Sequence, residues 1–351
     1  MLSGVWVMTS ASIDTLEAAA AGGDASAKRE LGKLALIGQA GARSTHNGAL
    51  LLVAAAEAGD AEADAVISVL IGADAKEPAD WDLALDYLGR AARRGWEPAC
   101  KQLALLCADR DLVKRSETEP FSAETWRAIR DRVDIAALIK PAPPRIMFEA
   151  PDIRIIERFA SPQECAWMIA RARPRIARAV VFDQQSGGKK IEDTRTNSMV
   201  MFNILDADFV LVMLHARIAA AAGVTARHLE ETNVLHYAVG QQFSRHFDFF
   251  NPERAALQRE IEGTGQRAAT FLIYLNEDFE GGETEFAKLD WRYKGAPGDA
   301  LLFRNVDPAG APDLQTLHAG LAPTRGEKWL LSQWIRSRTP RRPDEKQITA
   351  L

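Results

Sequence analysis

Three residues in the C-terminal half of the chain have the types and the spacing to bind one metal ion. His246 and Asp248 stand two positions apart in His-Phe-Asp, and His318 follows later. Because successive side chains of a β-strand point to opposite faces, a strand here would project His246 and Asp248 from the same side. If a later strand places His318 opposite them, the set offers two imidazoles and one carboxylate. That donor set is typical of non-haem Fe(II) oxygenases and leaves three metal positions open.

The sequence around these residues contains further short motifs. Gly-Gly-Glu-Thr-x-Phe (281–286), His-Ala-Gly (318–320) and Gly-Glu-Lys-Trp (326–329) follow one another at short distances. His318 alone would more often be a structural histidine, and Lys328 alone a solvated surface lysine. Together, the order and spacing over about residues 145–338 resemble the prolyl 4-hydroxylase-type 2-oxoglutarate/Fe(II) dioxygenases.

The resemblance implies a fold and a set of cofactors. It implies an oxygenase core that is a double-stranded β-helix, or jelly roll, with the metal between its two sheets. The implied cofactors are Fe(II), 2-oxoglutarate and O₂, with ascorbate as a bound reductant. His246, Asp248 and His318 match the family's metal ligands and are therefore expected to form the catalytic centre.

The co-substrate has its own expected residues. 2-Oxoglutarate chelates Fe(II) through its keto oxygen and adjacent carboxylate, so its distal carboxylate needs a cationic partner when it is buried. Lys328, ten positions after His318, matches the family's residue for this role. Tyr237 matches a tyrosine that hydrogen-bonds the co-substrate, and Tyr274 is expected to contact it as well.

Other polar residues are candidates for the substrate. Arg195, Glu230 and Arg267 lie where members of the family place groups that line the substrate groove. Arg336 follows Trp334-Ile335, where many prolyl hydroxylases have histidine, and it is a further candidate. This departure leaves the metal chemistry intact but weakens the case for a proline-containing substrate. The polar Gly-Gly loop at 183–194 matches a loop that closes over the substrate.

The N-terminal third contains a repeat of 36 residues. Its clearest columns are leucine and glycine, followed by alanine: Leu16, Leu52 and Leu88; Gly23, Gly59 and Gly95; Ala27, Ala63 and Ala99. Apolar residues within each unit follow helical spacing, and the glycine falls where one helix must stop. The pattern Ala-Ala-x-x-Gly-x-x-x-Ala resembles Sel-one-like repeats, relatives of tetratricopeptide repeats that stack helix pairs into a solenoid.

These patterns predict an α+β multidomain protein. We expect helices at about 12–22, 25–38, 46–58, 60–71, 80–94 and 97–108, and another near 122–138. Residues 1–115 would form the helical repeats, 116–144 a helix and Pro-rich linker, 145–340 the oxygenase domain and 341–351 a polar tail. The repeats would either bind a protein partner or brace the oxygenase core, and the sequence does not choose between these roles.

Composition limits the classes of function and the cellular compartment that the chain is expected to have. A net charge of −5 argues against a general nucleic-acid binder, and the N-terminus lacks the pattern of a signal peptide or a membrane span. Three cysteines, an odd number, favour free thiols in a reducing cytoplasm. The sequence does not specify an oligomeric state.

Three functional hypotheses remain. The chain could hydroxylate an unactivated C–H bond of a peptidyl residue, or of a free amino acid or other small molecule. It could also be a non-catalytic adaptor with a vestigial barrel. The complete set of His246, Asp248, His318 and Lys328 weakens the adaptor hypothesis, because an inactive relative would be free to lose them.

Overall fold

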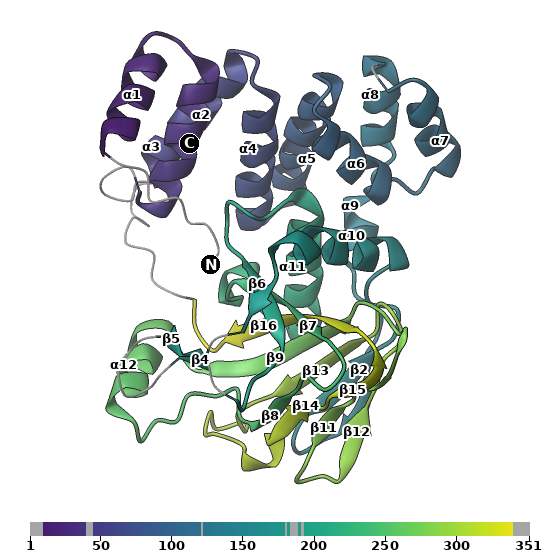
Figure 1. Cartoon of the computed structure of the whole chain (residues 1–351). Helices are drawn as coiled ribbons and strands as arrows, with labels where there is room; N and C mark the ends of the chain where they lie inside the picture. Colours follow the sequence, from purple (N-terminus) through teal and green to yellow (C-terminus); the bar gives the residue numbers. More distant parts are fainter. Residues whose placement is uncertain are drawn as a thin grey trace. The chain divides into compact units, whose positions relative to one another are not determined.

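The computed structural model describes residues 10–39, 45–120, 122–179, 181–182, 189–190 and 193–339 (Figure 1). Within these ranges the chain divides into two compact units. The helical unit contains residues up to 139 together with Ile204–Ala216, and the oxygenase unit contains Lys140–Asn203 and the residues from Arg217 onward. None of the helices in the described ranges is long and apolar enough to cross a membrane.

The second helix of each pair in the helical unit recurs at the interval of 36 residues that the sequence pattern indicates. Its first six helices are α1 Ser10–Ala21, α2 Ala25–Ile37, α3 Thr45–Glu57, α4 Ala61–Asp74, α5 Pro78–Arg93 and α6 Glu97–Leu106. The second helix of each pair starts at residue 25, 61 or 97, so the starts are 36 residues apart. Gly23, Gly59 and Gly95 precede these starts with φ of 99°, 100° and 82°, a conformation that favours glycine. Asp24 and Asp60 then cap α2 and α4.

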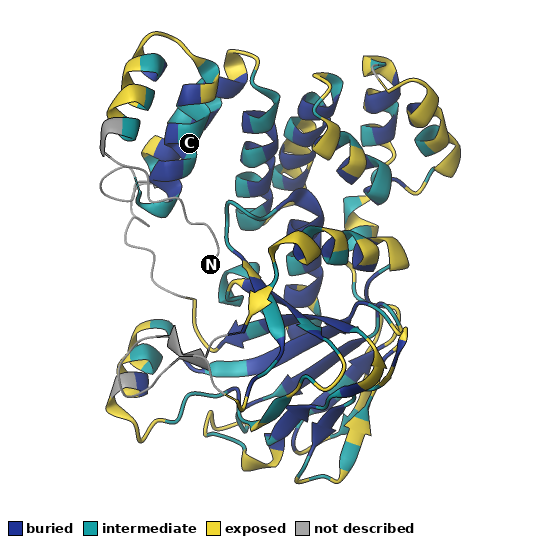
Figure 2. Ribbon diagram, in the orientation of Figure 1, coloured by how far each residue is buried: buried dark blue, intermediate teal, exposed yellow. Residues whose placement is uncertain are grey.

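Small residues let neighbouring helices of this unit approach closely. Gly32 in α2 faces Gly48 in α3, and a Cβ on either glycine would lie 2.9 Å from the other's carbonyl oxygen. Leu52, Ala55 and Ala63 are completely buried in the core between the helices (Figure 2). The alanine column (Ala27, Ala63 and Ala99) is therefore buried between helices, whereas the glycine column marks the turns before the helix starts.

Three short helices follow, two of them in the range where one long helix was expected. They are α7 Arg110–Thr118, α8 Ala123–Asp131 and α9 Ile135–Ile139. The expected helix at 122–138 is thus wrong, because it breaks after Asp131 and the Asp134 side chain accepts a hydrogen bond from Ala137 N to start α9. Helix α7 was missed because its sequence is mostly polar, with Ser116 its one buried residue.

A segment from the middle of the expected oxygenase domain completes the helical unit. Ile204–Ala216 includes the first part of α11 (Phe209–Ala222). The Phe209 ring packs edge-on against Trp81, with centroids 6.4 Å apart, and Gln102 accepts a hydrogen bond from Phe209 N. The apolar run that forms α11 was not recognised as part of this unit.

The oxygenase unit contains two facing antiparallel sheets. The major sheet has eight strands in the order β1 Arg145–Phe148, β2 Ile153–Ile156, β13 Ala300–Arg304, β9 Arg267–Tyr274, β16 Lys328–Arg336, β7 Thr232–Tyr237, β6 Ser198–Phe202 and β3 Ala177–Arg178. The minor sheet has four, in the order β12 Trp291–Tyr293, β11 Thr284–Phe286, β14 His318–Gly320 and β8 Phe243–His246. This architecture confirms the predicted jelly roll.

Smaller elements complete this unit. They are the strand pairs β4 Val181–Phe182 with β5 Lys189–Lys190 and β10 Phe279–Gly281 with β15 Pro323–Gly326, and the helices α10 Pro162–Ala172 and α12 Ala255–Thr264. Ser161 caps α10 in a capping box with Glu164, as its sequence indicates. Most of the expected closing loop at 183–194 and the tail at 341–351 lie outside the described residues.

Aromatic and aliphatic side chains fill the space between the two sheets. Phe286 of the minor sheet meets Phe303 of the major sheet edge-on, with centroids 5.1 Å apart. Ile153, Leu272 and Leu301 join the same cluster, and all five residues are at most 7% exposed. This packing fixes the separation of the sheets and so the position of residues that project between them.

Candidate active site

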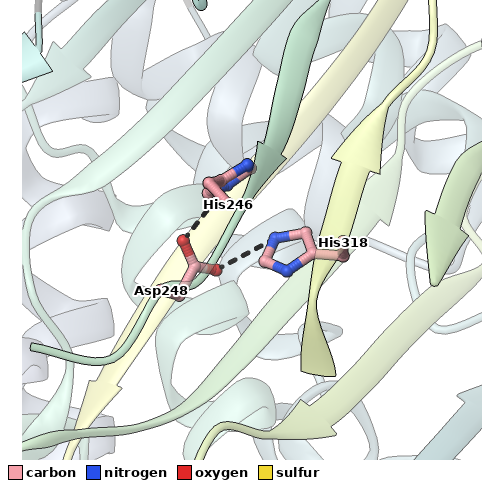
Figure 3. Close-up of side chains that lie close together, drawn as sticks. All are labelled: His246, Asp248 and His318. Carbon is pink, nitrogen blue, oxygen red and sulfur yellow. Dashed lines mark ion pairs between the residues drawn. The ribbon is translucent and has the colours of Figure 1, made fainter. Parts of the chain in front are cut away.

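The three expected metal ligands converge between the sheets (Figure 3). His318 at the start of β14 is the cross-strand partner of His246 at the end of β8. Asp248 lies two residues beyond β8, so the turn after the strand, rather than strand alternation alone, brings its carboxylate back. Its Oδ1 is 3.5 Å from His246 Nε2 and its Oδ2 is 3.5 Å from His318 Nε2.

Neighbouring groups orient each of these side chains. His246 Nδ1 lies 2.8 Å from Ser244 O, and His318 Nδ1 lies 2.9 Å from Thr316 O. If each Nδ1 carries the proton and donates it to these carbonyls, the Nε2 lone pairs are left for a metal. Asp248 Oδ2 accepts a hydrogen bond of 2.7 Å from Thr270 Oγ1, which in turn accepts one from Asn305 Nδ2.

The electrostatics of the three residues suit a cation. Burial by itself would raise the pKa of Asp248, but His318 and His246 bring that pKa well below its usual range. Burial and the neighbouring His318 lower the pKa of His246. The site therefore offers an ionised carboxylate and neutral imidazole, which are the ligand forms that a divalent metal requires.

Lys328 lies nearby as a buried cation. It is fully buried, and its Nζ has no hydrogen-bond partner among the described residues. The ammonium lies 4.9 Å from the ring centroid of Tyr237 and 5.7 Å from that of Tyr274. Burial lowers the pKa of Lys328 to about 7. A buried ammonium without an anion is costly, so this position suits a ligand carboxylate.

The two tyrosines have different surroundings. Tyr237 is the cross-strand partner of Lys328 and lines the cavity that contains the three metal-ligand candidates. The Tyr274 hydroxyl is 2.8 Å from both Thr284 Oγ1 and Tyr293 O. Neither Tyr274 nor Lys328 is among the residues that line this cavity. The Tyr274 ring lies beside the Lys328 ammonium, and the expected contact of Tyr274 with the co-substrate stays a prediction.

Arg195 is the one predicted substrate residue that lines the cavity. It is 6% exposed, donates from Nε to Asn197 Oδ1 at 3.2 Å, and lies over the Phe243 ring at 4.5 Å. Phe243 in turn stacks on His246 with centroids 3.5 Å apart. Arg195 is therefore held beside the metal-ligand candidates.

The other three predicted substrate residues form a charged cluster beside the cavity. Glu230 accepts two hydrogen bonds from Arg267, of 2.8 and 2.9 Å, and pairs with Arg336 at 2.6 Å. None of the three lines the cavity itself, and their expected place in the substrate groove stays a prediction. The Arg267 guanidinium lies 3.5 Å from the ring centroid of Trp334, which does line it. The cluster thus supports an aromatic wall.

Several cavity-lining residues were not predicted, among them the polar residues Asn233 and Ser332. Asn233 and Ser332 are buried, pair across β7 and β16, and line the cavity. A signal was available in the sequence: Asn233 is two residues from Leu235, and Ser332 is two residues from Leu330, so each polar residue shares a strand face with a leucine. A polar residue on an otherwise apolar face indicates a site between the sheets.

Comparisons with known proteins identify the family of this chain. Residues 232–336 match the 2OG-Fe(II) oxygenase superfamily. Probable prolyl 4-hydroxylase 3 of Arabidopsis thaliana is 31% identical over 200 residues, covering 52% of this chain and 68% of the relative. Prolyl 4-hydroxylase 1 of the same plant is 31% identical over 209 residues, covering 56% and 72%. The solved structure of a viral collagen prolyl hydroxylase from Paramecium bursaria Chlorella virus-1 has 25% identity and a TM-score of 0.41, covering 53% of this chain and 96% of that one.

The chain belongs to the prolyl 4-hydroxylase-type 2-oxoglutarate/Fe(II) dioxygenases. It is an oxidoreductase that uses Fe(II), 2-oxoglutarate and O₂. When bound, these cofactors supply the oxidant that hydroxylates a C–H bond while 2-oxoglutarate becomes succinate and CO₂. The converging His-Asp-His donors and the unpaired Lys328 ammonium fit the metal and the dicarboxylate, respectively.

Proposed function

We propose that His246, Asp248 and His318 bind Fe(II), and that the enzyme hydroxylates a peptidyl residue. The observation that carries this proposal is the convergence of three ligand atoms, all within 4.8 Å of one another, beside a buried cation. Lys328 would bind the distal carboxylate of 2-oxoglutarate, and the Tyr237 hydroxyl would donate a further hydrogen bond to it.

The protein's own groups have distinct tasks in this proposal. Thr270 and Asn305 hold Asp248, and the carbonyls of Ser244 and Thr316 fix the two imidazole rings. The surrounding apolar side chains exclude water, which strengthens the pairing of Lys328 with a carboxylate.

Replacement of the histidines tests the metal assignment. We expect His246→Ala and His318→Ala each to abolish Fe(II) binding in anaerobic equilibrium dialysis, and to stop the slow conversion of 2-oxoglutarate to succinate without substrate. His228, which contacts Thr225 away from the cavity, provides the control variant His228→Ala. Wild-type iron binding and turnover in both histidine variants would exclude the assignment.

A peptidyl prolyl substrate has support from two sides. The plant relatives are named prolyl 4-hydroxylases, and Arg195 and Trp334 offer a cation and an aromatic surface at the cavity. The alternative is a free amino acid or another small molecule. Incubation of the enzyme with proline-containing peptides and with free proline, followed by mass spectrometry, separates them. A +16 Da product from free proline alone would refute the peptide proposal.

We propose that the helical unit binds the polypeptide substrate, in the cytoplasm. Within this unit, Trp81, Val133, Ile135 and Ile139 line a groove that an extended chain could contact. Ile135→Asp should raise the KM for a long polypeptide and leave succinate formation without substrate unchanged. Leu50→Asp, at an exposed leucine of α3 outside the groove, is the matched control. Equal KM values in the two variants would favour a bracing role.

A further inference from the structure

We propose that Arg245, Glu285 and Arg292 form a clamp on the outer face of the minor sheet, and that this clamp positions His246 against His318. The proposal rests on the iron-binding role given above to these histidines. We call the three residues the outer clamp. They do not touch the cavity, so their role would be to position ligands rather than to take part in the reaction.

The strands that carry the two histidines have few main-chain contacts. Strand β8 has four residues, β14 has three, and their pairing is irregular between His318 and Gly320. On its other side β8 has an isolated bridge from Phe243 to Arg195 and a hydrogen bond of 2.8 Å from Ser244 N to Thr194 O. Short, irregular β-ladders fix the register of their strands only weakly. A side-chain connection across them can therefore help to hold the strands in register.

Strand alternation separates the clamp from the ligands. His246, His318 and Phe286 are cross-strand partners in one row that faces the interior. Arg245 and Glu285 are the preceding residues of β8 and β11, so their side chains point to the opposite, outer face. There Arg245 Nε donates to Glu285 Oε2 at 3.0 Å, and Arg292 Nη2 of β12 donates to Glu285 Oε1 at 2.9 Å.

The clamp crosses the central strand. Because β14 lies between β8 and β11, the Arg245 side chain must pass over β14 to reach Glu285. The residue opposite Glu285 on β14 is Ala319, which is 3% exposed. A small side chain at this position leaves the space that the arginine occupies.

Glu285 is the buried central residue of the outer clamp, and both arginines pair with its carboxylate. Its side chain is 9% exposed, whereas those of Arg245 and Arg292 are 60% and 61% exposed. One carboxylate therefore connects β8, β11 and β12 and spans β14. A shift of β8 along β14 would break the bond from Arg245 and would displace His246 at the same time.

Metal affinity in the full-length protein tests this proposal. We expect Glu285→Gln and Arg245→Met each to weaken binding of Fe(II), measured by anaerobic dialysis, and of redox-inert Mn(II), measured by EPR. The loss should be on the order of three- to fivefold, as for a partly exposed ion-pair network. The KM for 2-oxoglutarate at saturating iron should stay unchanged, and Arg245→Lys should keep most of the affinity.

The matched control is Asp152→Asn. Asp152 pairs with Arg154 at 2.7 Å and Arg304 at 3.9 Å, so it too is one acid between two arginines, but it lies beside the major sheet. Metal affinity in Glu285→Gln that equals that of Asp152→Asn overturns the clamp. An equal rise in the KM for 2-oxoglutarate also overturns it, because the effect would then be a general loosening of the core. Unchanged metal binding in His318→Ala would instead overturn the ligand assignment.

Discussion

At the scale of single residues, Lys328 combines complete burial with the absence of a polar partner among the described residues. Burial lowers its pKa from 10.5 to about 7. Below about pH 7 the folded protein keeps a buried charge, which costs stability. Between about pH 7 and 10.5 the unfolded chain binds more protons than the folded chain, so this residue makes stability rise with pH.

Protonation of Lys328 should couple to co-substrate binding. A carboxylate favours the charged ammonium, so above pH 7 the binding of 2-oxoglutarate should require uptake of a proton. We expect its affinity to fall from pH 7 to 8.5, by at most about tenfold per pH unit. Calorimetry in two buffers with different ionisation enthalpies measures the proton uptake. In Lys328→Met this pH dependence should vanish, and its persistence would place the proton elsewhere.

Removal of Lys328 should affect the co-substrate far more than the metal. We expect Lys328→Ala to weaken 2-oxoglutarate binding by about 2–5 kcal/mol, because a buried carboxylate would lose its partner. Tyr237→Phe should cost about 0.5–1.5 kcal/mol, the size of one hydrogen bond. Dialysis should show unchanged Fe(II) affinity in both variants. Arg325, a nearby arginine in sequence, is exposed and pairs with Glu280 at 2.6 Å, so Arg325→Ala is the control.

The positions of some site residues could be predicted from the sequence, because these positions depend on spacing along the chain. His246, His318 and Lys328 belong to this group because cross-strand pairing sets His246 against His318 and Lys328 against Tyr237. Residues whose role depends on side-chain direction were less predictable. Tyr274 turns its hydroxyl to Thr284, and Glu230 pairs with two arginines. The hydrogen-bond and ion-pair partners of Tyr274 and Glu230 are set by residues that are distant in sequence, so the local sequence does not indicate them.

At the scale of elements, β14 has an additional role through Gly320. A Cβ on Gly320 would lie 2.9 Å from the Tyr237 hydroxyl oxygen, which is closer than side chains allow. We expect Gly320→Ala to displace Tyr237 and to raise the KM for 2-oxoglutarate severalfold, with little change in Fe(II) affinity. Gly263→Ala, where a Cβ meets nothing within 4 Å, is the control. An unchanged KM in Gly320→Ala would show that Tyr237 contributes no contact.

Helix prediction succeeded where periodic burial and turn residues agreed. Gly59 and Asp60, for example, mark the end of one helix and the cap of the next. It failed at α7, where a polar helix buries little, and at α8 and α9, where a local cap at Asp134 divides one expected helix into two. The periodic signal alone does not show such a division.

At the scale of the whole molecule, the boundary between the units does not follow the sequence. Ile204–Ala216 belongs to the helical unit although it lies between strands β6 and β7 of the oxygenase unit. A fragment that begins at residue 140 would contain this segment without the helices it packs against. Phe209, which is completely buried, would lose its contact with Trp81. Tests of the helical unit therefore need the full chain.

Replacement of Phe209 measures how much the packing of Ile204–Ala216 against the rest of the helical unit contributes to stability. We expect Phe209→Ala to lower the free energy of unfolding by about 3–5 kcal/mol, through the cavity it leaves. Below the unfolding transition, 2-oxoglutarate affinity should match that of the wild type, because Phe209 is not a cavity residue. Thermal denaturation, with the exposed Leu314→Ala as control, measures the first effect. A loss under 1 kcal/mol would contradict the packing role.

The three residues of β14 have consequences for how the gene tolerates mutation. His318 is one of the three metal-ligand candidates, Ala319 is the cross-strand partner of Glu285, and Gly320 adjoins Tyr237. Each position therefore excludes larger side chains or other donors for a different reason. In a saturation library selected for hydroxylation, we expect this triplet to accept almost no substitutions while neighbouring Leu317 and Leu321, which are partly exposed, accept several. Adaptation of the enzyme to new substrates would then have to proceed through the residues around Arg195 and Trp334 and leave β14 untouched.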